Sequence, residues 1–94
     1  MNDARGEVGL SIGGVERRLC LTLGALAEIE TAFGCASMGE LQVRLKQLSA
    51  GELMQVVAAL MRGAGEVVED LREVDLSPGA AAKAVAEAFR AALG

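Results

Sequence analysis

The chain has 94 residues, of which 52% are hydrophobic, and its formal net charge is −4. A chain of this length buries roughly two-thirds of its unfolded surface in one core, so we expect a single domain over residues 1–94. The acidic charge and the lack of clustered Lys and Arg argue against nucleic acid or a lipid surface as a partner.

The sequence also bears on compartment and redox state. No apolar run reaches the roughly 18 residues that span a bilayer, and residues 1–6 have neither a basic start nor an apolar signal region. We expect a cytoplasmic protein without a membrane partner, in which residues 1–6 form a flexible leader. Cys20 and Cys35 are too few for a disulfide framework and are not spaced as a metal site, so we expect both to be reduced.

Residues 7–23 have the pattern of a β-hairpin. Polar and apolar residues alternate over residues 7–12 and again over residues 15–23, and the intervening Gly13-Gly14 readily takes the positive φ angles of a two-residue turn. One face of this hairpin is apolar, with Arg17 as its single exception. The register that follows from the turn is Ile12 with Val15, Leu10 with Arg17, Val8 with Leu19 and Glu7 with Cys20.

The helical part is predicted over residues 24–94. Thr22 has the position of a helix N-cap and Gly34 that of a C-terminal stop, which predicts a first helix over residues 25–33. Ser37 is followed three residues later by a glutamate, as in a capping box, which predicts a second helix over residues 38 to about 48.

Ser49 repeats the capping box with Glu52 and predicts a third helix that ends at Arg62-Gly63. Residues 66–74 have apolar positions at helical spacing but form either a short helix or an irregular turn. Ser77-Pro78 then opens a last, alanine-rich helix that runs to Leu93. The predicted fold class is therefore α+β, an N-terminal two-stranded antiparallel β-hairpin followed by four to five short helices packed on one face.

The residue types argue against catalysis. Histidine is absent, which removes the commonest general base and the commonest metal ligand. Ser37, Ser49 and Ser77 are explained as helix caps, and Glu66 and Asp70, four residues apart, are interpreted as a solvated helix face. We expect no enzymatic activity, no cofactor and no metal.

Methionine repacks easily against varied surfaces, so Met38, Met54 and Met61 are the candidate partner-binding residues. Met38 and Met61 lie on helix stripes, for which core packing is the favoured interpretation. Met54 lies beside its stripe and is the first candidate for an exposed apolar side chain.

Four segments of the chain stand out together: Gly6-Glu7-Val8, Ile12-Gly13-Gly14, Leu21 to Glu30 and Phe33-Gly34. Together they resemble a known family, the small tail proteins of gene transfer agents and related siphophages. The resemblance continues through residues 53–65, a helix that ends in a glycine-rich turn. The chain departs from the family in the segment after that turn and in a plainer last helix.

The resemblance implies a role in phage tail morphogenesis. Members are described as tail tube proteins and as tail assembly chaperones, so it implies tape-measure and tail tube proteins as partners and a location in the host cytoplasm or the virion tail. An assembly chaperone is the interpretation we favour, because a single hairpin is poor in strand for building a tube. A structural component of the tail tube is the alternative.

A two-stranded hairpin has unpaired edges, which favour pairing with a second copy of the chain. We therefore predict a homo-oligomer in solution. Analytical ultracentrifugation over a concentration series measures this, and a strictly monomeric profile at high concentration would contradict it.

Overall fold

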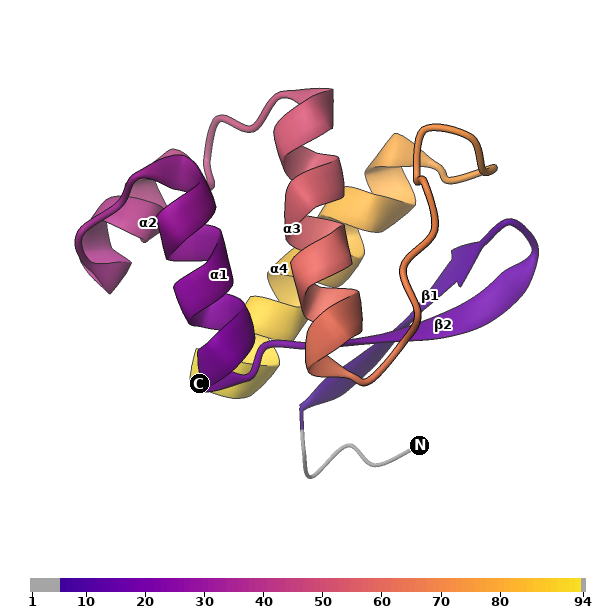
Figure 1. Ribbon diagram of the computed structural model, residues 1–94, viewed down its shortest axis with the longest axis horizontal. Helices are drawn as coiled ribbons and strands as arrows, with labels where there is room; N and C mark the ends of the chain where they lie inside the picture. Colours follow the sequence, from indigo (N-terminus) through magenta and orange to yellow (C-terminus); the bar gives the residue numbers. More distant parts are fainter. Residues whose placement is uncertain (1–5, 94) are drawn as a thin grey trace.

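The computed structural model describes residues 6–93. Residues 1–5 of the expected leader lie outside the described residues, whereas Gly6 is buried. The element order confirms the predicted α+β class (Figure 1). The elements are β1 (Glu7–Ile12), β2 (Val15–Cys20), α1 (Leu23–Phe33), α2 (Met38–Arg44), α3 (Ala50–Gly63) and α4 (Pro78–Leu93).

The hairpin has the predicted register. Val8 pairs with Leu19, Leu10 with Arg17 and Ile12 with Val15. Gly13 and Gly14 have φ angles of 61° and 81°, a backbone conformation that side chains with a Cβ rarely adopt. The second strand ends at Cys20, three residues earlier than predicted, because Thr22 already serves as the N-cap of α1.

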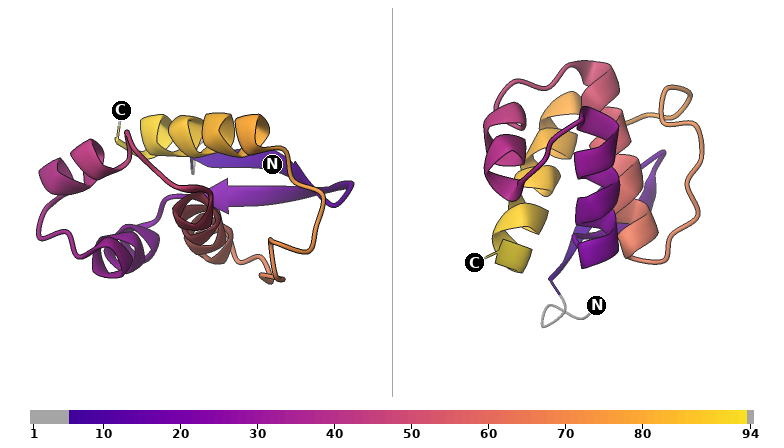
Figure 2. Two further views of the ribbon diagram at one scale, coloured as in Figure 1. Left: turned by 90° about the horizontal axis from the view of Figure 1, so that it is seen from above. Right: turned by 60° about the vertical axis from the view of Figure 1, so that its left-hand side comes forward.

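The helices bury one face of the hairpin. α3 packs on β2 and α4 packs mainly on β1, whereas α1 packs on α3 and α2 packs on α1 (Figure 2). Leu10, Ile12 and Leu19 of the hairpin are buried, while Gly9, Ser11 and Glu16 on the other face are exposed. A two-stranded hairpin is only marginally stable by itself, so this helical cover stabilises it.

α3 lies at the centre of the core. Its residues Val56, Val57, Leu60 and Met61 are fully buried, with no exposed surface above 1%. The helix also approaches the end of β2 closely, because a Cβ added at Gly63 would lie 2.2 Å from the carbonyl oxygen of Cys20. Glycine is therefore required at this contact between helix and strand.

The helix starts follow the capping signals. The Ser49 side chain accepts a hydrogen bond from the Glu52 amide, and the Glu52 carboxylate accepts one from the Ser49 amide, so this capping box is complete. The Ser37 side chain likewise caps α2, but the Glu40 carboxylate accepts from the amide of Ala36, one residue before the predicted donor.

The structure differs from one predicted helix end and decides the form of the segment after α3. α2 ends at Arg44 instead of continuing to about residue 48, because amide-to-carbonyl bonds three residues apart, from Lys46 to Val43 and from Gln47 to Arg44, tighten the chain into a turn. Of the two predicted forms, a short helix or an irregular turn, residues 66–74 take the irregular one. Gly65, with a φ of 80°, directs the chain out of α3 into this segment.

The close contact at Gly63 predicts the effect of two matched substitutions in α3. Gly63→Ala should lower the free energy of unfolding by roughly 1–3 kcal/mol, because the new methyl group meets backbone that cannot move without shifting β2. Gly51→Ala, where a Cβ meets nothing within 4 Å, should instead raise it by roughly 0.4–1 kcal/mol. Urea denaturation measures both, and equal effects of the two substitutions would contradict the close contact.

Candidate partner-binding groove

An open apolar groove lies between α4 and the turn that joins α2 to α3. We call it the α4 groove; its volume is about 640 Å³. This is within the range of roughly 300–1,000 Å³ typical of binding sites. Its lining residues are mostly apolar and are Gln42, Leu45, Lys46, Leu48, Leu53, Ala82, Val85, Ala86, Phe89, Arg90 and Leu93.

A second apolar groove of about 560 Å³ lies between α3, the start of α4 and residues 71–76. We call it the loop groove. Leu48 and Leu53 line both grooves, so the two form one continuous apolar surface. The other apolar residues of the loop groove include Met54, Val57, Leu71, Val74 and Leu76.

Arg44 positions the turn that forms one wall of the α4 groove. Its guanidinium donates to the carbonyl of Gln47 at 3.2 Å and to the carboxylate of Glu52, which joins the end of α2 to the start of α3. The same guanidinium lies 5.3 Å from the centre of the Phe33 ring, which is a cation–π distance. Arg44 therefore also contacts the last residue of α1. The hydrogen bond from Arg44, with further bonds from Ser49, holds the pKa of Glu52 below its usual value.

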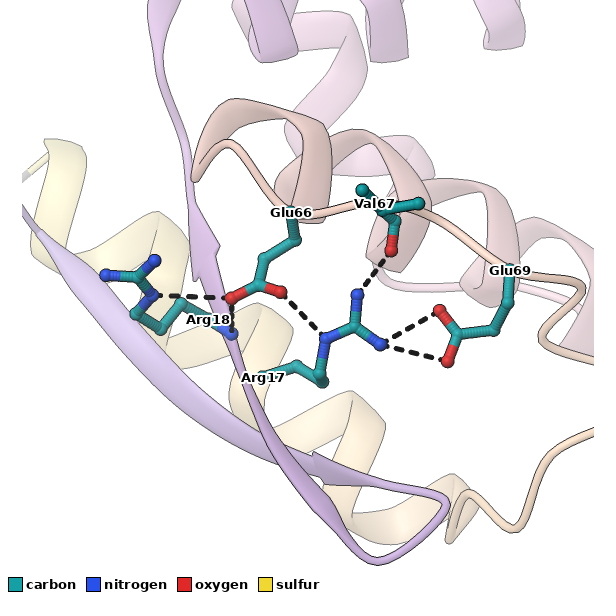
Figure 3. Close-up of polar contacts among 5 residues, drawn as sticks. All are labelled: Arg17, Arg18, Glu66, Val67 and Glu69. Atoms are coloured by element: carbon teal, nitrogen blue, oxygen red, sulfur yellow. Dashed lines mark hydrogen bonds and ion pairs between the residues drawn. The ribbon is translucent and has the colours of Figure 1, made fainter.

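Arg17 and Arg18 position the start of the irregular segment after α3 (Figure 3). The Arg17 guanidinium donates to Glu66 at 2.7 Å, to both carboxylate oxygens of Glu69 at 2.9 and 3.0 Å, and to the carbonyl of Val67. The other carboxylate oxygen of Glu66 accepts from the backbone amide and the side chain of Arg18. One cluster therefore fastens residues 66–69 to β2.

This cluster explains Arg17 and corrects one prediction. Arg17 interrupts the apolar face because its guanidinium reaches beyond that face to the loop, and only 15% of its side chain is exposed. Glu66 was expected on a solvated face, yet its side chain is only 17% exposed and is ion-paired with Arg17. The hydrogen bond from Arg17, followed by those from Arg18, lowers the pKa of Glu66.

The three candidate methionines lie in different environments. Met61 is fully buried in the core, so it cannot form part of a surface in this fold. Met38 is 42% exposed, which shows that the favoured core interpretation was wrong for it, and it lines neither groove. Met54 is partly buried and lines the loop groove; its role in binding stays a prediction.

Sequence reasoning missed the other groove residues. Leu48, Leu53 and Phe89 lie at helical stripe spacing in the sequence, and stripe positions have the same spacing whether they face a core or a groove. The early end of α2 is what leaves Leu45 and Leu48 in a turn beside α4. The cations Lys46 and Arg90, which flank these positions, were the one available signal in the sequence.

The chain matches a known protein family over nearly its whole length. The family described as "phage tail tube protein, GTA-gp10" matches residues 5–94. The chain belongs to this family of phage tail proteins. Neither a curated protein nor a solved structure matches the chain. Among residues 6–93, no helix is long and apolar enough to cross a membrane.

The Arg17 cluster predicts how stability depends on pH. The folded-state pKa of Glu66 lies below its ordinary value of 4.5, so its ionised form stabilises the fold above that pH, and the contribution is lost as pH falls through the folded pKa. Arg17→Gln should therefore lower stability at neutral pH and make the loss of stability on acidification shallower. Urea midpoints measured from pH 7 down to about pH 3 test this.

Arg62→Gln is the matched control, because the Arg62–Glu28 pair is 49% and 40% exposed and exposed pairs contribute little. This variant should keep the acid dependence of the original chain. If the urea midpoints of Arg17→Gln and Arg62→Gln had the same pH dependence, the Arg17 cluster would not stabilise the position of residues 66–69 on β2.

Proposed function

We propose that this protein is a tail assembly chaperone. In this role it binds the tape-measure protein, keeps the apolar stretches of that protein in solution and passes it to the tail tube subunits. The observation that carries the proposal is the continuous apolar surface of the two grooves, which the fold leaves open on a small acidic domain of a phage tail family.

The construction of the grooves supports binding rather than catalysis. Apolar side chains such as Leu53 and Phe89 dominate the lining, and this matches surfaces that hold the apolar side of another chain. Three of the described carboxyl groups have a lowered pKa, and they are Glu52, Glu66 and Asp70. In each case the largest cause is a hydrogen bond from an arginine that holds a turn in place. With no histidine in the chain, we propose no enzymatic role.

A structural component of the tail tube is the second candidate, and the description of the family favours it. Against it stands the small amount of strand: the described sheet has two strands of six residues each. The carboxylate of Glu66 also accepts the hydrogen bond from the Arg18 amide, so part of the outer edge of β2 is occupied. Pairing with a second copy along this edge of β2 would therefore have to break the bond from the Arg18 amide to Glu66.

The proposal predicts where the protein is found during tail assembly. Quantitative mass spectrometry of purified tail particles should find it absent or far below the tube subunit. A tagged copy isolated from lysate during assembly should bring down the tape-measure protein. A copy number in the particle close to that of the tube subunit would contradict the chaperone and favour the structural component.

A further inference from the structure

The charge of the α4 groove is opposite to that of the whole chain. The sequence has 13 acidic and 9 basic residues, yet the charged residues that line the α4 groove are Lys46 and Arg90. The loop groove has Arg72 in its lining, but this cation is paired with Asp70. The positive charge beside the apolar surface therefore lies at the α4 groove.

Among the described residues, the two cations of the α4 groove also lack the carboxylate partners that the other arginines have. Within residues 6–93, carboxylates pair with Arg17, Arg18, Arg44, Arg62 and Arg72. Lys46 and Arg90 are exposed and take part in none of the ion pairs of this region. Lys83 is a third such cation, but it does not line the groove. An occupant with carboxylates beside its apolar side chains would complement this charge.

The walls of the α4 groove favour a helix as the occupant. One wall is the helix α4, whose backbone groups bond within the helix, and the other is a turn in which the amides of Lys46 and Gln47 already donate to carbonyls of α2. The groove therefore presents side chains and no strand edge. A bound segment has to satisfy its own backbone hydrogen bonds, which a helix does.

We propose that the α4 groove binds an amphipathic helix of a partner tail protein, with an apolar stripe that packs on Leu48, Leu53 and Phe89 and with flanking carboxylates that pair with Lys46 and Arg90. This inference rests on the proposed chaperone function and specifies the chemistry of the client segment. It also makes selection electrostatic: a helix with the same apolar stripe but basic flanks is disfavoured by like charges at both positions.

Two synthetic helical peptides test the proposal. Both carry leucines at positions i, i+4 and i+7, and the stripe is flanked by glutamates in one peptide and by lysines in the other. Fluorescence anisotropy measures their affinity for the full chain. The chain should bind the glutamate peptide about tenfold or more tightly than the lysine peptide, and this preference should shrink at high salt.

Charge reversal in the groove supplies the decisive variant. The double substitution Lys46→Glu/Arg90→Glu should reverse the preference, so that the lysine peptide binds more tightly. A gain of binding cannot result from unfolding. Lys83→Glu is the control, because it reverses the charge of one residue of α4 that does not line the groove. This variant should keep the preference for the glutamate peptide.

The outcomes separate this inference from the proposed function. Equal affinity for the two peptides, or an unchanged preference in the double variant, overturns the acidic helix as occupant. If the double variant loses self-association while neither peptide binds, a second copy occupies the groove and the proposal is wrong. If the peptides show the charge-dependent preference but the tagged protein does not bring down the tape-measure protein, the acidic helix stands as the occupant of the groove and the chaperone function is wrong.

Discussion

The packing of α3 on β2 is the constraint on which the rest of the structure depends. A two-stranded hairpin has too little surface to be stable alone, so it depends on the cover that α3, with fully buried residues such as Val57 and Leu60, supplies on β2 and that α4 supplies mainly on β1. Gly63 allows the end of this helix to approach the Cys20 carbonyl. α1 and α4 then pack on α3, so the position of α3 fixes the arrangement of the other long helices.

The same helix connects the core to the candidate site. Most apolar residues from the middle of α3 onward are buried, whereas Leu53 and Met54 near its start are only partly covered and line the grooves. Each groove has one irregular wall, which is the turn after α2 in the α4 groove and residues 71–76 in the loop groove. Arginine–glutamate contacts hold both: Arg44 with Glu52 at the turn, and Arg17 with Glu66 and Glu69 at the segment after α3.

The hairpin and the helix starts could be predicted because their signals are local. Gly13-Gly14 and the alternation around it determine the register, and Ser49 with Glu52 forms its capping box within four consecutive residues. The segment after α3 could not be predicted in this way, because Arg17 and Glu66 are 49 positions apart in the sequence. Periodicity also does not separate Met61, which is buried, from Met38, which is exposed, since both lie on helix stripes.

We propose that the α4 groove receives a client protein during tail assembly. Site-specific photo-crosslinking in assembling tails tests this, with the crosslinker placed at Phe89 in the groove or at Ser11 on the exposed face of the hairpin. We expect a crosslink to the tape-measure protein from position 89 and none from position 11. Crosslinks from position 11 to neighbouring subunits in finished tails, with none from position 89, would contradict it.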